Sequence, residues 1–217
     1  MAMTLAGYYA ILDLTIRDLA DSRHVANALE RAERLLAGAP CMLQLRAKSA
    51  SASQLAVLAR AIQPAARRTS IPFCVNDRLD VALAVRADAV HLGQNDLPLA
   101  DAHKVAGGRL LVGVSTHNLE QARTAVTGGA DYIGLGPIFA TTTKANPDPV
   151  VGTNLLKEIS TGVAAAIPVV AIGGITLVSV TDLVGAGAAA AALIGAIEAA
   201  GDPVAAARAI NAAFGRS

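Results

Sequence analysis

Eight short apolar segments divide this chain at fairly regular intervals, and stretches with helical periodicity lie between them. Most of these segments are apolar on consecutive residues, which is typical of parallel strands that helices cover on both faces. Several helical stretches open on a capping residue, such as Ser53, Asn118 or Thr176. The predicted strands are residues 8–12, 41–45, 72–75, 88–92, 110–114, 131–135, 168–172 and 189–194. The clearest predicted helices are residues 23–37, 53–67, 118–127 and 176–186.

The number of strand–helix units predicts the architecture. Eight units without a second compositional zone favour a (β/α)8 barrel, the TIM barrel of the α/β class, over an open doubly wound sheet. The chain has 217 residues, which suits one large α/β domain, so we predict a single barrel domain over residues 1–217. The eighth strand rests mainly on its position between Gly187 and Gly195, because alanine favours helices over strands. A single long helix over the alanine-rich residues 183–213 is the alternative.

Composition excludes several classes of protein. The chain is 53% hydrophobic and 16% charged, which is incompatible with a disordered protein. A net charge of +1 and only 3% aromatic residues give no electrostatic or stacking basis for binding nucleic acid. We therefore expect small-molecule partners, and the sequence leaves a homo-oligomer open.

One uncharged stretch raises the question of a membrane helix. Residues 159–181 carry no charge and are long enough to span a bilayer. However, Pro168 and the pair Gly173-Gly174 divide this stretch into a helix end, a short β-branched strand and a new helix start. We therefore predict a buried strand here and no membrane span.

The N-terminus and the cysteines indicate a cytoplasmic protein. The N-terminal residues have no basic region before their apolar run and reach Asp13 early, so they do not resemble a signal peptide. Cys41 and Cys74 lie inside apolar runs without disulfide-scaffold or zinc spacing. We expect both to be buried small hydrophobic residues in a reducing compartment.

The candidate site consists of polar residues and glycines that follow the predicted strands. In a barrel of this kind, active sites lie at the C-terminal ends of the strands, so these residues meet whatever their separation in sequence. They are Gln44, Arg46, Lys48, Asn76, Asp77, Gln94, Asp96, Ser115, His117, the loop 136–152, Gly173, Gly174 and Gly195.

Two aspartates in this set predict a metal site. Asp77 and Asp96 follow adjacent strands, which lie about 4.8 Å apart, so their carboxylates could share one cation. Two carboxylates with room for water and phosphate oxygens suit Mg²⁺, which takes few protein ligands. Each aspartate also has a simpler explanation: Asp77 could cap a helix over residues 78–86, and Asp96 could start the turn before Pro98.

Three cations accompany the aspartates. Arg46 and Lys48 lie at a strand end, and Lys144 lies in the loop segment ATTTKANPDP, which is longer than most connections. Positive side chains beside a metal suit a diphosphate, whose charge must be neutralised when it departs. Solvated surface charge is the alternative for each of them.

Glycines after the last two strands suggest a second anion site. Gly173, Gly174 and Gly195 would expose backbone N–H groups where barrels of this kind most often hold phosphate, although they could simply form tight turns. His91 and His117 have no catalytic or metal spacing around them. We expect His91 to pack or hydrogen-bond, and we expect Ser115 to bind substrate rather than attack it.

Several motifs together resemble the thiamine-phosphate synthase family. They are YYAILD at 8–13, QLRAK at 44–48, VNDRLDVALAVRADAVHLGQNDLP at 75–98, GVSTHN at 113–118, ADYIGLGPIFATTTK at 130–144, PVVAIGGIT at 168–176 and LIGAI at 193–197. The resemblance implies a transferase of thiamine biosynthesis. Such an enzyme joins 4-amino-2-methyl-5-hydroxymethylpyrimidine diphosphate to hydroxyethylthiazole phosphate, giving thiamine phosphate and diphosphate.

The resemblance also implies roles for individual residues. Those expected at the pyrimidine diphosphate are Gln44, Leu45, Arg46, Ala47, Lys48, Asn76, Ser115 and Lys144, of which Arg46, Lys48 and Lys144 would stabilise the diphosphate. The expected Mg²⁺ ligands are Asp77 and Asp96. Those expected at the thiazole phosphate are Thr141, Thr142, Thr143, Gly173, Gly174, Ile194 and Gly195. The mechanism that the resemblance implies is ionisation of the pyrimidine carbon–oxygen bond, which requires no protein nucleophile.

The chain departs from the family pattern at three positions. Ala47 and Asn95 stand where acidic residues are common, and because neither position is a direct ligand we expect only tuning. Gly195 stands where a serine is usual, which removes a hydroxyl that could help to hold the thiazole phosphate. Two alternatives remain: a thiazole tautomerase-like isomerase, which handles thiazole phosphate alone, and a non-catalytic phosphoester-binding barrel, which could dispense with the aspartates.

Overall fold

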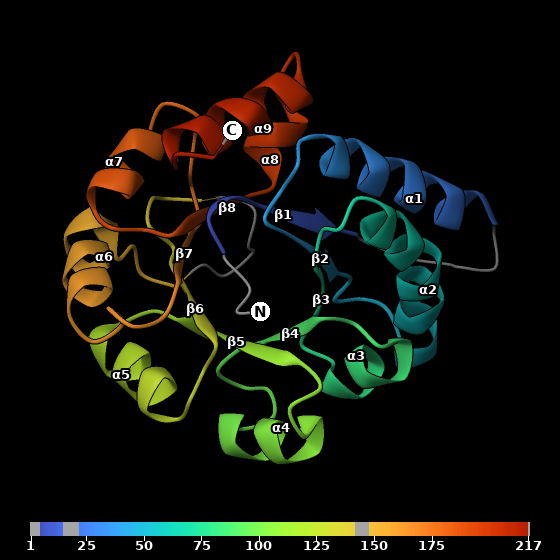
Figure 1. The fold of residues 1–217 in the computed structure, drawn as a ribbon, viewed down its shortest axis with the longest axis horizontal. Helices are drawn as coiled ribbons and strands as arrows, with labels where there is room; N and C mark the ends of the chain where they lie inside the picture. Colours follow the sequence, from blue (N-terminus) through green and yellow to red (C-terminus); the bar gives the residue numbers. More distant parts are fainter. Residues whose placement is uncertain (1–4, 15–21, 142–147, 217) are drawn as a thin grey trace.

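Eight parallel strands close into a barrel surrounded by helices in a computed structural model that describes residues 5–14, 22–141 and 148–216 (Figure 1). The strands are β1 (Gly7–Asp13), β2 (Met42–Arg46), β3 (Phe73–Asn76), β4 (Ala89–Leu92), β5 (Leu111–Thr116), β6 (Tyr132–Leu135), β7 (Val169–Ile172) and β8 (Ala190–Leu193). The helices are α1 (Ser22–Ala37), α2 (Ala52–Arg68), α3 (Leu79–Val85), α4 (Leu99–Ala106), α5 (Leu119–Thr127), α6 (Gly152–Thr161), α7 (Val180–Gly185), α8 (Gly195–Glu198) and α9 (Pro203–Ala213). The predicted TIM barrel is confirmed, and each strand overlaps its predicted region, although β1, β2, β3 and β5 extend one or two residues beyond it.

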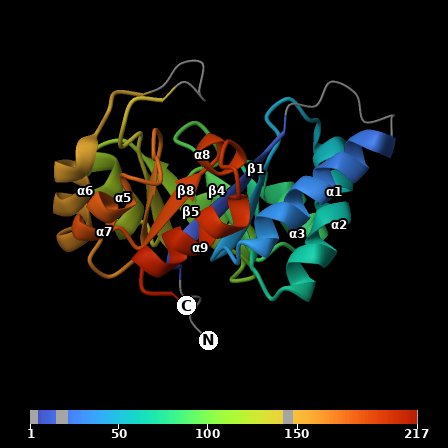
Figure 2. The ribbon, with the colours of Figure 1, turned by 90° about the horizontal axis from the view of Figure 1, so that it is seen from above.

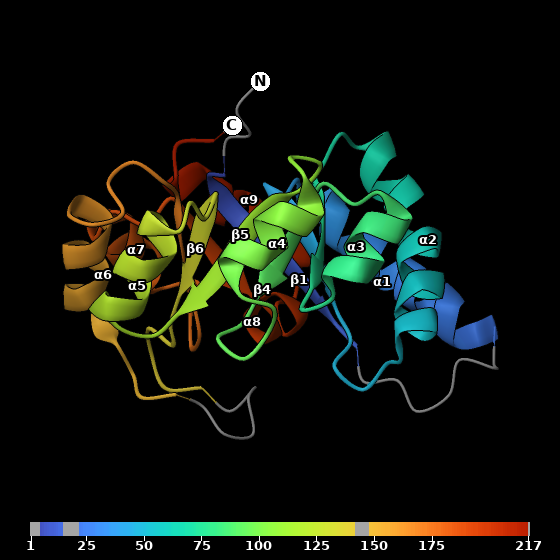
Figure 3. The same ribbon diagram turned by 90° about the horizontal axis from the view of Figure 1, so that it is seen from below.

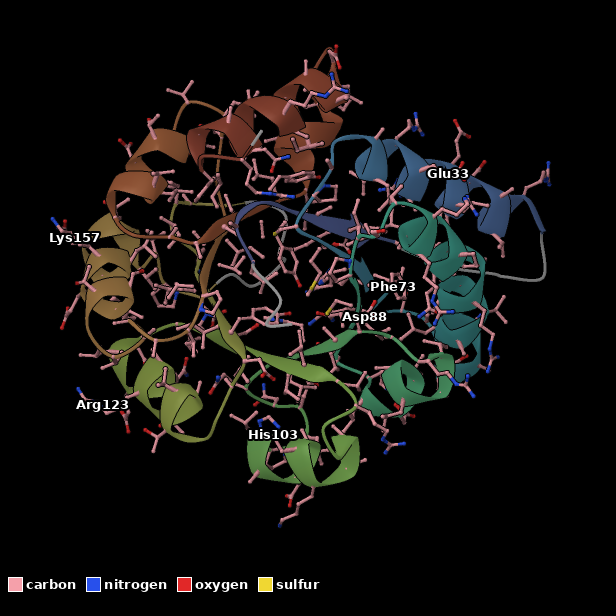
Figure 4. All side chains as sticks on the ribbon, in the orientation of Figure 1. Glu33, Phe73, Asp88, His103, Arg123 and Lys157 are labelled. Atoms are coloured by element: carbon pink, nitrogen blue, oxygen red, sulfur yellow. The ribbon has the colours of Figure 1, made fainter. Side chains whose placement is uncertain are left out.

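Apolar side chains form two layers on the two faces of the barrel wall. Tyr8 belongs to the layer between strands and helices, whereas its neighbour Tyr9 belongs to the cluster inside the barrel, as expected from the alternation of side chains along a strand. Figure 4 shows side chains filling the barrel interior, and Glu33, Arg123 and Lys157 extending outward from the surrounding helices. Because the strands are covered on both faces, the consecutive apolar pattern was an informative signal.

The alanine-rich eighth strand forms despite its helical propensity. Residues Ala190–Leu193 are hydrogen-bonded between β7 and β1, with Ala192 beside Tyr9 in the register. Their side chains are almost fully buried, so pairing on both edges and packing decide the conformation. The alternative of a single long helix over 183–213 is therefore wrong.

The last helix packs in the outer ring against β1, α1 and α7, and its residues hold the N-terminal end of β1 (Figure 1). Asn211 in α9 accepts a hydrogen bond from the Tyr8 backbone N–H at 2.9 Å, and Arg216 donates to the Ala6 carbonyl at 3.0 Å. In Figures 2 and 3, α8 lies at the opposite end of the barrel from the last residues of the chain. The last residues of the chain therefore lie at the N-terminal ends of the strands, away from their C-terminal ends.

Two predicted helix starts were wrong, and one was right. Ser51, not Ser53, caps α2, because its hydroxyl accepts from Gln54 N while the Gln54 side chain accepts from Ser51 N. Helix α7 begins at Val180, since Thr176 and Ser179 form a separate hydrogen-bonded turn before it. The Asn118 side chain caps α5, as predicted.

The buried cysteines and the uncharged stretch behave as predicted. Cys41 and Cys74 are free and buried, and burial raises the pKa of each thiol to about 12. Residues 159–181 include the end of α6, the whole of β7 and the start of α7. Within the described part of the chain, no helix is long and apolar enough to cross a membrane.

Candidate active site

A cavity of about 490 Å³ opens at the C-terminal ends of the strands, a size typical of small-molecule sites. Most of the predicted site residues line it, namely Gln44, Arg46, Lys48, Asn76, Asp77, Gln94, Asp96, Ser115, His117, Thr141, Gly173, Gly174, Ile194 and Gly195. Leu45 and Ala47 are buried in the layer between strands and helices, so their side chains face away from it. Thr142, Thr143 and Lys144 lie outside the described residues.

The two predicted metal ligands lie close enough to interact. Asp77 directly follows β3, where its backbone N–H donates to the His91 carbonyl at 2.8 Å and its φ is +63°. Partial burial, together with the nearby negative charge of Asp96, raises the pKa of Asp77 to about 6, while Lys48 opposes this rise. A carboxylate held beside another carboxylate in a half-buried position favours a bound cation or proton.

Of the simpler explanations for these two aspartates, the structure contradicts the one for Asp77 and supports the one for Asp96. Helix α3 begins after Arg78 and has no side-chain cap, so the capping explanation of Asp77 is wrong. Asp96 does stabilise a turn, since its Oδ2 accepts from the Gly93 backbone N–H at 2.6 Å. Its other carboxylate oxygen is not needed for that bond, so a turn and a cation site are compatible at Asp96.

The donor set fits a hard cation with few protein ligands. Oxygen ligands from one or two carboxylates, completed by water and phosphate oxygens, are the usual environment of Mg²⁺. Asp77 and Asp96 supply two such groups. Among the described residues there is no cluster of three or more His, Cys, Asp or Glu side chains suited to a metal.

The cations at the end of β2 are paired with carboxylates at the mouth of the cavity. Arg46 Nη1 lies 2.5 Å from Asp13 Oδ2, and Lys48 Nζ lies 3.9 Å from Asp77 Oδ2. Asp13 is the last residue of β1 and lies beside Arg46 in the register. Asp13 was not among the predicted site residues, although it too is a polar residue at the end of a strand. Arg46 is therefore an oriented group and not a freely solvated charge.

A chain of polar side chains runs through the barrel interior to the cavity wall. Gln44 Nε2 donates to the Tyr9 hydroxyl at 2.8 Å, and that hydroxyl lies 3.0 Å from the Tyr132 hydroxyl. Tyr132 lies 3.1 Å from His91 Nδ1, and His91 Nε2 lies 3.0 Å from Ser115 Oγ. His91 hydrogen-bonds, as predicted. Tyr9 and Tyr132 were missed, because tyrosines inside apolar strand segments are usually packing residues.

The histidine beside Ser115 does not make a nucleophilic triad. The sequence shows no base partner for Ser115, because His91 and Ser115 come from two neighbouring strands. In a triad the second ring nitrogen faces a carboxylate, but here His91 Nδ1 faces the Tyr132 hydroxyl. Burial lowers the pKa of His91 to about 4, so the ring is neutral at pH 7. The arrangement orients Ser115 without activating it for attack.

Two loops meet at the other side of the cavity. Gly173 and Gly174 have φ values of +93° and +66°, in the left-handed region that favours glycine. The loop after β6 packs directly on them, with the Ile138 and Phe139 N–H groups donating to the carbonyls of Ile172 and Gly173. The tight-turn explanation of this glycine pair thus holds, and the turn forms part of the cavity wall.

His117 and Gly195 complete this rim of the cavity. His117 Nδ1 contacts the Gly136 carbonyl at 2.5 Å, and its Nε2 lies 3.6 Å from Asp148 Oδ2. His117 therefore links the loops after β5 and β6. Gly195 begins α8, and a Cβ placed there would meet no atom within 4 Å.

Comparison with known proteins agrees with this geometry. Residues 16–197 match the sequence profile of a family described as thiamine monophosphate synthase. The chain belongs to the thiamine monophosphate synthase family. It is similar to a thiamine-phosphate synthase of Chloroflexus aurantiacus, with 47% identity over 83% of this chain and 82% of that protein. A second synthase, from Shouchella clausii, is 42% identical over 95% of this chain and 96% of its own length.

A solved structure extends the similarity to three dimensions. Thiamine phosphate pyrophosphorylase from Pyrococcus furiosus superposes with a TM-score of 0.82 and 31% identity, covering 98% of this chain and 96% of that one. The thiamine monophosphate synthase family thus accounts for the barrel over nearly its whole length.

Proposed function

We propose that this chain is a thiamine-phosphate synthase, a transferase that condenses the pyrimidine diphosphate with hydroxyethylthiazole phosphate. The observation that carries this proposal is one cavity that brings the carboxylates of Asp77 and Asp96 together with Arg46 and Lys48. Such a site suits a diphosphate and its metal. The family and the 47% identical synthase support the same activity.

The reaction needs charge stabilisation and positioning rather than a nucleophile. The pyrimidine methylene carbon–oxygen bond breaks, and its electron pair leaves with the diphosphate. The thiazole nitrogen then donates its lone pair to that carbon, which gives thiamine phosphate. Mg²⁺, when bound, would neutralise the diphosphate oxygens. Arg46 and Lys48 would stabilise the leaving charge from fixed positions, while Gln44, Asn76 and Ser115 would orient the pyrimidine.

The other rim of the cavity would hold the thiazole phosphate. Thr141, Gly173, Gly174, Ile194 and Gly195 line this part of the wall. Backbone N–H groups of glycine turns after the last two strands are a common phosphate site in barrels. We assign Thr142, Thr143 and Lys144 to the same reaction on family resemblance alone. A cytoplasmic location and the lack of a nucleic-acid partner remain predictions from composition.

The two alternative functions are less well supported. A thiazole tautomerase-like isomerase acts on thiazole phosphate alone and would not need a diphosphate and metal site. A non-catalytic phosphoester-binding barrel would need neither aspartate. The pairing of Asp77 with Lys48 at 3.9 Å, next to Asp96, favours the synthase.

One assay tests the proposal directly. The purified chain is mixed with both substrates, with and without Mg²⁺, and thiamine phosphate is measured by chromatography. We expect product only with metal and both substrates. A folded protein that forms no product with Mg²⁺ present would contradict the synthase assignment, and conversion of the thiazole phosphate alone would indicate the isomerase.

Magnesium affinity is expected to weaken in mild acid. The pKa of Asp77 is raised from 3.8 to about 6, so a proton competes with the metal below about pH 6, and the apparent affinity falls as the pH is lowered through that value. In the metal-free protein, the contribution of Asp77 to the free energy of unfolding falls as the pH rises from 3.8 to about 6. In this range the folded state still holds the proton that the unfolded state has released. Calorimetric titration with Mg²⁺ and diphosphate between about pH 5 and pH 8 measures the effect.

Asp80 provides the control for the pH profile. It is an exposed aspartate three residues from Asp77 that pairs with Arg78, which lowers its pKa. Asp80→Asn should leave the pH dependence of Mg²⁺ binding unchanged, whereas Asp77→Asn should remove the step near pH 6. A step of equal size in the Asp77→Asn variant would show that another group is responsible.

Restoring a serine at position 195 is expected to strengthen thiazole phosphate binding. The backbone there is not in the left-handed region, and an added Cβ would meet open space. One extra hydrogen bond of about 1 kcal/mol corresponds to about a fivefold lower KM for thiazole phosphate in Gly195→Ser. Steady-state kinetics measure this change. Gly201→Ser, also in open space, is the control, and an equal change in both variants would contradict a direct contact.

A further inference from the structure

The interior polar chain joins the two side chains assigned to the pyrimidine diphosphate. It runs from Gln44 through Tyr9, Tyr132 and His91 to Ser115, with every link between 2.8 and 3.1 Å. Gln44, Tyr9 and Tyr132 are at most 4% exposed, so the hydrogen bonds among these three side chains are shielded from bulk water. A buried polar chain of this kind fixes the orientation of each member through its neighbours.

The hydrogen bonds along this chain all run in one direction, because each hydroxyl has only one proton to donate. Gln44 donates to the Tyr9 hydroxyl, so the single proton of Tyr9 is left for the Tyr132 hydroxyl. Tyr132 must then donate onward, and its other acceptors are the sulfurs of Met42 at 3.9 Å and Cys74 at 3.8 Å. Sulfur is a weak acceptor, so the Tyr132 proton goes to His91 Nδ1.

The tautomer of His91 follows from this direction. A neutral imidazole that accepts at Nδ1 carries its proton on Nε2, and that nitrogen lies 3.0 Å from Ser115 Oγ. Ser115 therefore accepts from His91, and its own proton is left to point toward the cavity. If the Gln44 amide were flipped, its oxygen would accept from Tyr9, and every hydrogen bond in the chain would reverse its direction. Ser115 would then donate its proton to His91.

Two glycines make room for the rings in this chain. A Cβ on Gly113 in β5 would lie 2.1 Å from the Tyr132 ring, and a Cβ on Gly134 in β6 would lie 3.0 Å from the His91 ring. Any larger residue at position 113 would displace Tyr132. The lack of a side chain at these two positions therefore leaves the space that both rings occupy.

We propose that Tyr9, Tyr132 and His91 are positioning residues for the synthase reaction. Together they transmit the orientation of the Gln44 amide to Ser115, so that Ser115 meets the pyrimidine diphosphate as a hydrogen-bond donor. This inference rests on the proposed function. A donor is what an anionic diphosphate oxygen or a pyrimidine ring nitrogen requires, whereas the reversed chain would present only lone pairs.

The first test measures the tautomer and does not depend on activity. The full-length protein is prepared with isotope-labelled histidine nitrogens, and nuclear magnetic resonance distinguishes protonated from unprotonated ring nitrogens at neutral pH. The chain has four histidines, and His91→Asn identifies the signals of His91. We expect a protonated Nε2 and an unprotonated Nδ1. A protonated Nδ1 with an unprotonated Nε2 would overturn the proposal.

The second test compares two buried tyrosines, Tyr132 in β6 and Tyr8 in β1. Tyr132→Phe removes the donor to His91 and is expected to lower kcat/KM for the pyrimidine diphosphate about tenfold, the effect of one hydrogen bond. Its KM for thiazole phosphate should not change. Tyr8→Phe makes the same chemical change at a fully buried tyrosine on the other face of β1. Equal losses in the two variants would mean that Tyr132 acts only through general packing.

A double-mutant cycle shows whether Tyr132 acts through Ser115. With Ser115→Ala as background, Tyr132→Phe should cause little further loss of kcat/KM, because the group that it orients is absent. Additive losses would overturn the relay. If the unaltered protein made no thiamine phosphate, the proposed function would fail, while the resonance test would still decide the direction of the chain.

Discussion

Asp77→Asn is expected to lower the turnover number for thiamine phosphate formation by about a hundredfold or more. The substitution keeps the shape of the side chain but removes the negative charge that Asp77 places beside Asp96. A metal ligand that loses its charge binds Mg²⁺ weakly, and the departing diphosphate then lacks its main neutralising charge. Loss of one preorganised electrostatic contact commonly costs about a hundredfold to a thousandfold in rate. Steady-state kinetics at saturating substrate measure the change.

The two substrates should respond differently to this substitution. Thiazole phosphate contacts the opposite rim in our assignment, so its binding, measured by calorimetry in the presence of diphosphate, should change much less than turnover. Asp96→Asn should behave similarly, although its remaining oxygen can still accept from the Gly93 N–H. Equal losses of turnover and thiazole phosphate binding would contradict the assignment of these aspartates to the diphosphate.

Asp88→Asn is the matched control for charge removal. Asp88 lies immediately before β4, at the N-terminal end of the strand, and its carboxylate accepts from the Phe73 N–H at 2.8 Å. Figure 4 labels both residues. The asparagine oxygen can still accept this bond, so turnover should stay within about twofold of the unaltered protein. A hundredfold loss in Asp88→Asn as well would show that the aspartates act through the fold.

Much of the barrel could be predicted because its strands are read from local patterns. Consecutive apolar residues between turn signals indicated each strand, and closure into a barrel followed from their number. Even the alanine-rich β8 was found by position, although pairing with β7 and β1 is what holds it as a strand. Helix starts were less accurate at Ser53 and Thr176, because a hydroxyl residue near a helix start can cap it or form its own turn.

The site residues at the strand ends were largely predicted, whereas the hydrogen bonds between residues inside the barrel were not. Polar residues at strand ends gave Asp77, Asp96 and Arg46, because parallel strands present their C-terminal ends on one face. The Tyr9–Tyr132 contact joins residues 123 positions apart, and its partners lie inside apolar segments that resemble ordinary core. Such contacts depend on which side chains the closed barrel brings face to face, and sequence periodicity does not contain that information.

Gly174→Ala is expected to destabilise the protein and to weaken thiazole phosphate binding together. Gly174 has a φ of +66°, and a Cβ there would lie 2.4 Å from the Ala140 carbonyl oxygen and 2.6 Å from that of Phe139. The left-handed backbone alone costs an alanine about 1 to 2 kcal/mol. Because the opposing atoms are backbone, the whole loop after β6 must shift as well. We expect a total cost of about 3 kcal/mol, which lowers Tm by about 9 °C in a chain of this size.

The same displacement should reach the substrate. The loop after β6 carries Thr141 into the cavity wall next to Gly173 and Gly174, so moving it raises KM for thiazole phosphate more than KM for the pyrimidine diphosphate.

Gly185→Ala is the control, because Gly185 is the last residue of α7 and a Cβ there meets open space. Alanine in a helix is favoured over glycine by up to about 1 kcal/mol, so this variant should be as stable as the unaltered protein or slightly more stable. If both variants had the same Tm, the close packing of the two loops would not be what requires glycine at position 174. A large loss of stability in Gly174→Ala with both KM values unchanged would show that the glycine turn is not part of the thiazole phosphate site.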